Sequence, residues 1–253
     1  MDTISLINTA IACLIGFLVS IISVVVGGTS LITVPLLISL GLTSRGAIAT
    51  NKFALIFLSL SGAINFRREV KIDTPGLIIY FLILTIIGSI IGANLVIALS
   101  DVVLKKIIGS IMIVILFITL SSKELGVIER KINISWKNLA VGSLIVLPLS
   151  VYSGFFSGGY VTILSYSLIL IYGFSFLQVA TITKILNIFS SIVACIVFAA
   201  NHLIIYSIAI PLAISMCLGA FIGVKLSLKK GNIWVKRIFS IFVVILAIKL
   251  FFF

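Results

Sequence analysis

The stretch GGTSLITVPLLISLGLTSRGAIATNK, from Gly27 to Lys52, decides the fold because the chain repeats its pattern as GGYVTILSYSLILIYGFSFLQVATITK, from Gly158 to Lys184. Aligning Gly41 with Gly173 places Lys52 opposite Lys184 without a gap, eleven residues further on in each copy. Both lysines lie inside long apolar segments, where a cation is expensive. Two such lysines at matching places in a repeat predict a binding site for an anion.

The composition is that of a membrane protein: 62% of the 253 residues are hydrophobic, 9% are charged and the mean hydropathy is +1.41. Apolar runs of about 20 residues recur along the chain, which is the length a helix needs to cross a bilayer. The net charge of +12 lies mostly in short loops, where basic residues orient the chain rather than bind nucleic acid. The predicted partners are therefore the lipid bilayer and a small anion, and a homodimer is compatible with the sequence. No cofactor or metal is expected.

Each copy of the pattern begins with a glycine pair that interrupts an apolar segment. Gly27-Gly28 is followed by Ser30, a good helix N-cap, and then by a segment of only ten residues, 31–40, or about 15 Å of helix. Gly158-Gly159 is followed in the same way by the short segment 160–172. Short, glycine-interrupted segments at corresponding places in two halves are typical of transporters with a substrate site between discontinuous helices.

The predicted fold is an all-α polytopic membrane protein of two inverted repeats, each with about five helical segments and a discontinuous helix at its glycine break. The first repeat covers residues 1–120, a polar cytoplasmic linker covers 121–138, and the second repeat covers 139–253. We expect a turn around Asp101 to Lys106, a loop over 227–236, and a capping box formed by Ser175 and Gln178. Longer segments are expected at residues 4–26, 47–66, 76–99, 107–120, 139–157, 179–200, 205–226 and 237–253.

Basic residues in the loops favour the inverted arrangement. If the short segments only dip into the bilayer, each side carries seven basic loop residues. If they count as crossings, one side carries eleven and the other three. The positive-inside rule therefore predicts ten crossings with both termini outside.

Lys52 and Lys184 have polar neighbours of the kind that bind anions. All six carboxylates map to loops or termini, so an anionic ligand is the natural counter-charge. The start of each short helix adds N–H groups and a partial positive charge, and glycine lets a ligand approach the backbone. The predicted substrate-binding residues are Lys52, Lys184, Asn51, Thr50, Thr183, Asn187, Gly27, Gly28, Gly158 and Gly159.

A second interpretation of the two lysines is that they snorkel to an interface or cap the C-terminus of a neighbouring helix, since each lies only five or six residues from the start of its helix. Lys225 and Lys249, near segment ends, are expected to do this. The pairs Gly88/Gly92 and Gly219/Gly223 fit Gly-x-x-x-Gly in matching segments and predict close helix packing. His202, the single histidine, is expected in a solvated loop. With no nucleophile–base pair and no carboxylate pair, enzyme activity is not expected.

Several motifs resemble those of the sulfite-exporter (TauE/SafE-type) membrane permeases. Ala47-Ile-Ala-Thr-Asn-Lys52 and Val70-Lys-Ile-Asp73 resemble the first half of that family, and Thr183-Lys-Ile-Leu-Asn187, Leu218-Gly-Ala220 and Lys229-Lys-Gly231 resemble the second half. The resemblance implies an inner-membrane carrier of small sulfur-containing anions such as sulfite and sulfonates. Both glycine stretches are shorter than is usual in the family, and bulky Tyr160 follows the second pair, so the substrate's shape is expected to differ from that of the best-known members.

The sequence therefore predicts a permease for small anions, in particular sulfur oxyanions such as sulfite or organosulfonates, that works by alternating access. Because the apolar segments contain no Asp or Glu to relay protons, we expect electrogenic transport in which the membrane potential favours export. The alternatives are a non-transporting membrane subunit or scaffold and an uptake carrier for a different organic anion. An enzyme acting on anionic lipid head groups is a further alternative, for which the chain lacks an acid–base or nucleophile set.

Overall fold

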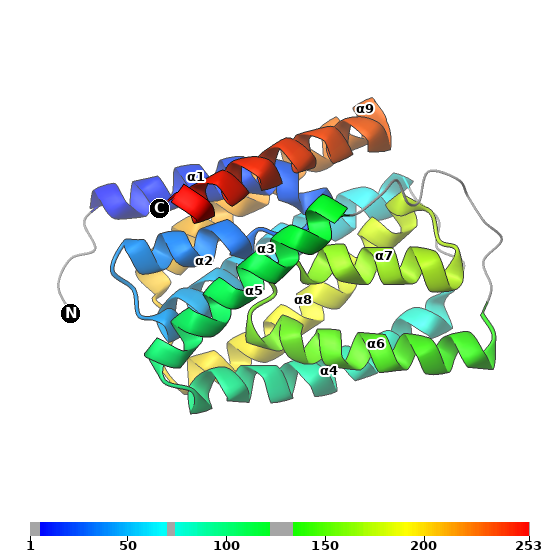
Figure 1. The fold of residues 1–253 in the computed structure, drawn as a ribbon, viewed down its shortest axis with the longest axis horizontal. Coiled ribbons are helices and arrows are strands. Elements are labelled where there is room, and N and C mark those ends of the chain that lie inside the picture. Colours follow the sequence, from blue (N-terminus) through cyan, green and yellow to red (C-terminus); the bar gives the residue numbers. More distant parts are fainter. Residues whose placement is uncertain (1–5, 70–73, 122–133, 253) are drawn as a thin grey trace.

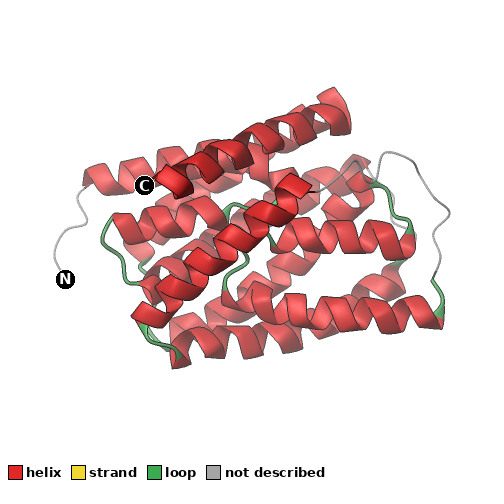
Figure 2. Cartoon of the chain, in the orientation of Figure 1, coloured by secondary structure: helices red, strands yellow, loops and turns green. Residues whose placement is uncertain are grey.

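The computed structural model describes residues 6–69, 74–121 and 134–252, and over these residues the regular secondary structure is entirely helical (Figure 2). Six helices in this part of the chain are long and apolar enough to cross a membrane, which confirms the predicted all-α polytopic membrane class. Residues 122–133 of the predicted linker lie outside the described residues. The helices, labelled in Figure 1, are α1 (Leu6–Val26), α2 (Ser30–Ser39), α3 (Ser44–Glu69), α4 (Pro75–Ala98), α5 (Asp101–Ser121), α6 (Trp136–Phe155), α7 (Tyr160–Tyr172), α8 (Phe176–Ala200) and α9 (Tyr206–Phe252).

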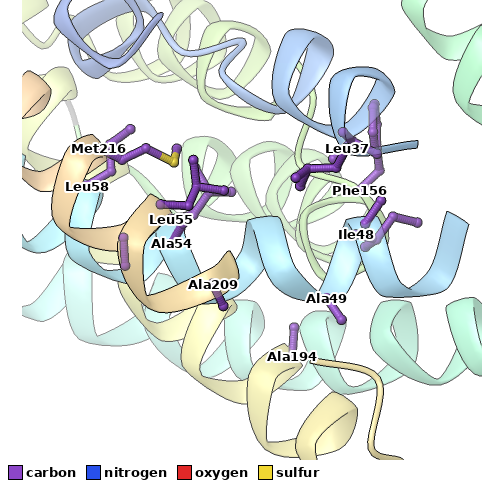
Figure 3. Packing of buried hydrophobic residues seen from close by; sticks show 14 of the residues in the cluster. Leu37, Ile48, Ala49, Ala54, Leu55, Leu58, Phe156, Ala194, Ala209 and Met216 are labelled. Carbon is purple, nitrogen blue, oxygen red and sulfur yellow. The ribbon is translucent and has the colours of Figure 1, made fainter. Parts of the chain in front are cut away.

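Helix α3 lies at the centre of the bundle. Of its membrane-length apolar window 72% is buried, against 33% in α1. Figure 3 shows buried α3 side chains between neighbouring helices, with Leu37 on α2, Ala194 on α8 and Met216 on α9. A helix surrounded by other helices faces little lipid, so it can carry polar side chains that would be costly at the lipid surface.

The two halves of the chain are interlocked rather than placed side by side. The fourth helix of each half packs on the first helix of the other half, α4 on α6 and α9 on α1, while α3 packs on α8. A Cβ on Gly92 would overlap the carbonyl oxygen of Val151 in α6, and a Cβ on Gly223 would overlap that of Ile21 in α1. The packing role predicted for the Gly-x-x-x-Gly pairs is therefore confirmed.

The glycine breaks and the short helices lie where the sequence places them. Helix α2 is ten residues long and α7 is thirteen, and both follow a glycine pair. Gly27, Gly28 and Gly159 have φ angles of +89°, +87° and +75°, which side chains rarely tolerate and glycine adopts readily. The predicted capping box is also confirmed, because Ser175 and Gln178 bond each other's backbone N–H groups at the start of α8.

Two helix starts differ from the prediction. Ser30 is the first residue of α2 rather than its N-cap, and the actual N-cap, Thr29, makes no side-chain capping bond. The predicted turn at Asp101 to Lys106 is instead the first part of α5. Asp101 suits a helix start because a carboxylate interacts favourably with the N-terminal dipole. Its two oxygens also accept the backbone N–H groups of Ser44 and Arg45, each at 3.3 Å, which ties α5 to the start of α3.

The prediction of a loop over 227–236 is also wrong. Helical geometry continues through these residues, so α9 runs from Tyr206 to Phe252. Lysine and leucine are good helix formers, and a single glycine such as Gly231 weakens a helix without ending it. A charged interruption in an apolar run indicates where a segment can leave the hydrocarbon core, but it does not by itself break the backbone hydrogen bonding.

Candidate anion-binding site

Lys52 lies within α3, and its side chain is fully buried. Its Nζ donates a hydrogen bond of 2.5 Å to Ser157 Oγ at the second glycine break. Ser157 has a φ of +66°, which is uncommon for a residue other than glycine, and its hydroxyl donates to the Ser153 carbonyl at 2.7 Å. The lysine of the first half is therefore bound to the helix break of the second half.

Lys184 is the matching lysine on α8 and is only 1% exposed. Its aliphatic stem lies against Gly62 of α3, where an added Cβ would stand 3.3 Å from Lys184 Cγ. Among the described residues, hydrogen bonds reach Lys52 and Asn187 in this region but none reaches the Lys184 ammonium group. A buried cation without a partner is costly. Lys184 is therefore the lysine for which a bound anion would matter most.

The two lysines are thus related by the repeat but differ in their contacts. The residue that precedes the glycine pair is Val26 in the first half and Ser157 in the second. Serine supplies an acceptor for Lys52, whereas valine has no polar group to offer at the corresponding place. Lys52 therefore has a hydrogen-bond partner at a helix break, and no such bond is present at Lys184 within the described part of the chain.

A small cavity of about 10 Å³ lies at Lys184, between the two helix breaks. A volume of about 10–15 Å³ admits about one water molecule, so the site is nearly closed in this conformation. The start of α2 contributes to its wall, and a helix N-terminus favours negative charge. The cavity is lined by Lys184, Asn187, Gly27, Gly28, Thr29, Ser30 and Ser157, with Leu55, Leu58 and Val161 as its apolar part.

Lys225, which is expected to snorkel, differs from these two lysines in its surroundings. Its side chain is exposed, and its Nζ lies 4.1 Å from the centre of the Phe221 ring on the same helix. Lys52 and Lys184 are instead enclosed by neighbouring helices. Their burial favours the anion-site interpretation over snorkelling.

Other predicted site residues have structural hydrogen bonds. The Asn51 side chain donates to Ser30 Oγ at 2.9 Å and accepts from Thr33 Oγ1 at 2.5 Å, so both ends of its amide hold α2 against α3. Thr50 Oγ1 accepts the backbone N–H of Ile205 at 3.2 Å. The Thr183 hydroxyl donates to the Ala180 carbonyl within its own helix at 3.2 Å. These three residues shape the site and do not line the cavity.

The second glycine pair also contributes backbone rather than cavity wall. The Gly158 carbonyl accepts a hydrogen bond from the Tyr152 hydroxyl, and Gly159 is the left-handed N-cap of α7. Of the ten predicted residues, the structure therefore brings four together in the cavity, and Lys52 reaches its edge through Ser157. The four are Lys184, Asn187, Gly27 and Gly28.

Metal-ligating side chains do not cluster in the described residues. No group of three His, Cys, Asp or Glu side chains there could hold a metal ion. His202 is exposed in the turn between α8 and α9, as expected of a loop residue. The buried polar side chains in the described part of the chain are therefore lysines, serines, threonines and asparagines.

Comparison with known proteins places the chain among membrane transporters. A model of the family described as "Sulfite exporter TauE/SafE" matches residues 12–250, nearly the whole chain. The chain belongs to this family. As a TauE/SafE protein it is a multi-pass transporter of the cell membrane, and the resemblance seen in its motifs is confirmed.

Curated relatives of this TauE/SafE protein carry the same general description. A "Probable membrane transporter protein" of Haemophilus influenzae is 29% identical over 88% of this chain and 86% of its own length. The "Probable membrane transporter protein YfcA" of Escherichia coli K12 is 28% identical over 95% of this chain and 87% of its own length. The "Probable membrane transporter protein ORF9" of a Sinorhizobium species is 25% identical over 92% of this chain and 88% of its own length. No solved structure matches the chain significantly.

One part of the site in this TauE/SafE protein was missed by sequence reasoning. Behind Ser157 runs a chain of buried hydroxyl groups on three helices: Ser153 Oγ lies 2.7 Å from Ser190 Oγ, which accepts from Ser89 Oγ at 2.8 Å. These serines fix the backbone around the second break and hold Ser157 in front of Lys52. In the sequence, only Ser157 is marked, because it stands immediately before a glycine pair. Helix packing brings the other serines close to it, and the local sequence does not indicate this.

Proposed function

We propose that this TauE/SafE protein is a secondary carrier for small anions, in particular sulfur oxyanions such as sulfite or organosulfonates. The observation that carries the proposal is the buried, unpaired ammonium group of Lys184 in a small cavity between two helix breaks. A cation in that position is stabilised by a bound anion, and the start of α2 adds positive potential on the same wall. The family's description supports sulfur oxyanions as the substrate class.

Alternating access between two inverted repeats is the mechanism that we propose. The support is the reciprocal packing of α4 on α6 and of α9 on α1, with the small cavity lying between the two glycine breaks. Lys184 of the second half faces the break of the first half, while Lys52 of the first half binds the break of the second. A relative movement of the halves would change both contacts together, which couples the anion to the opening of the site.

We propose further that transport is electrogenic and favours export. In a cell with a negative interior, each negative charge that leaves gains about 2.3 kcal/mol per 100 mV. A tenfold concentration ratio corresponds to about 1.4 kcal/mol, so the potential alone can drive a monovalent anion outward against more than a tenfold gradient.

We expect the purified chain, reconstituted alone into liposomes, to move sulfite and small organosulfonates. The measurement is the flux of each member of a panel containing sulfite, methanesulfonate, sulfate and acetate, with a neutral sulfone of similar size as the control. Sulfite and the sulfonate should pass in preference to the neutral compound, because the cavity provides a cation and positive helix dipole. A chain that is folded but moves none of these anions would instead be a non-transporting subunit or scaffold.

A further inference from the structure

Asn187 supplies the observation from which the class of substrate can be narrowed. It lies one helical turn after Lys184 on the same face of α8, is 3% exposed, and lines the same cavity. Its Nδ2 donates to Ser59 Oγ at 2.8 Å, but its Oδ1 has no hydrogen-bond partner among the described residues. A buried amide oxygen without a partner is unfavourable, and such groups in native proteins call for an explanation.

The orientation of this amide agrees with the charges around it. If the side chain were rotated by 180°, its NH₂ group would take the place of the unpartnered oxygen, at a cavity whose wall includes the cationic residue Lys184. The carbonyl oxygen is the end that a positive environment favours. The cavity therefore offers a hydrogen-bond acceptor, Asn187 Oδ1, beside a cation. An anion that has only acceptor atoms would leave this oxygen unpaired.

We infer that the anion held at Lys184 carries a hydrogen-bond donor as well as its negative charge, and that Asn187 Oδ1 accepts that donor. This inference rests on the proposed function. The fitting class is a small monoanion with an O–H or N–H group, such as a sulfur oxyanion that retains one proton or a hydroxyalkyl sulfonate. A site built around a hydrogen-bonding substrate group discriminates strongly against analogues that lack it, because its own polar atom is then left unpaired.

The test uses two sulfonates of nearly equal size, 2-hydroxyethanesulfonate and propane-1-sulfonate, in which a hydroxyl group replaces a methyl group. Binding of each to the purified full chain is measured by calorimetric titration. The native protein should bind the hydroxy compound about tenfold more tightly, the effect of one well-placed hydrogen bond. In Asn187→Leu this preference should disappear while propane-1-sulfonate still binds. Asn94→Leu, at an exposed asparagine of α4, is the matched control and should keep the preference.

Two results would count against the inference, and they have different meanings. Equal binding of the two sulfonates by the native protein would overturn the donor requirement and leave the anion site intact. Failure of both to bind would contradict the donor requirement and the proposed function together. Because the comparison within the native protein needs no substitution, it remains decisive even if Asn187→Leu does not fold.

Discussion

Replacing Lys184 by alanine is expected to weaken anion binding about 30-fold or more, whereas replacing Lys225 by alanine should leave it unchanged. Lys184 is buried and unpaired in the cavity, while Lys225 is exposed beside Phe221. Removing one member of a buried charge pair costs about 2 kcal/mol or more, which corresponds to this loss of affinity. Lys184→Arg keeps the charge but not the shape of the group, so it should retain part of the binding.

The Lys184 variants are compared by titrating each purified protein with sulfite, after its helix content and unfolding temperature have been checked. Alanine at this position removes a buried cation that lacks a partner, so the variant without ligand should be folded and no less stable. Normal anion affinity in folded Lys184→Ala would show that the lysine does not bind substrate.

Replacing Gly92 by alanine is expected to disrupt the packing of α4 on α6, whereas the same replacement at Gly109 should be harmless. A Cβ on Gly92 would overlap the Val151 carbonyl oxygen and lie 2.7 Å from the Phe155 nitrogen, and backbone atoms cannot move aside as a flexible side chain can. A Cβ on Gly109, in α5, would meet nothing within 4 Å. Overpacking of a close contact typically costs about 1–3 kcal/mol.

The two glycine variants share the same chemical change within a helix, so intrinsic helix propensity affects them alike. The measurement is the yield of monodisperse protein from membranes and its apparent unfolding temperature. Both the yield and the unfolding temperature should be clearly lower in Gly92→Ala, and neither should be lower in Gly109→Ala. Equal behaviour of the two would mean that α4 and α6 do not approach as closely as the structure has them.

Local patterns sufficed for much of the fold. The limits of α7 at Tyr160 and Tyr172 follow from glycines on both sides, and the capping box at Ser175 marks the next helix start. The patterns failed where charge was taken as a sign of irregular backbone, at Asp101 and over 227–236. Charged residues are compatible with helices, so polarity locates the membrane boundary more reliably than it locates a helix end.

The positions of the two buried lysines could be predicted from the sequence, whereas the hydrogen-bond partners of the polar residues could not. The burial of Lys52 and Lys184 agrees with their positions inside long apolar segments, which can be recognised in the sequence. The partners of Asn51 and Thr50 are Ser30 and Ile205, which packing brings from other helices. The role of Ser157 likewise depends on a bond to Lys52 across 105 residues of sequence. Such pairings are decided by tertiary packing and have no local signature.

The central claim is that this protein alone carries a negatively charged solute across the membrane. The most direct test is anion flux in liposomes containing only the purified chain, under an imposed potassium-diffusion potential without a pH or sodium gradient. We predict that sulfite flux follows the imposed voltage and reverses when its sign is reversed, because net negative charge moves with each cycle. Flux that ignores voltage but follows an imposed pH gradient would contradict this account.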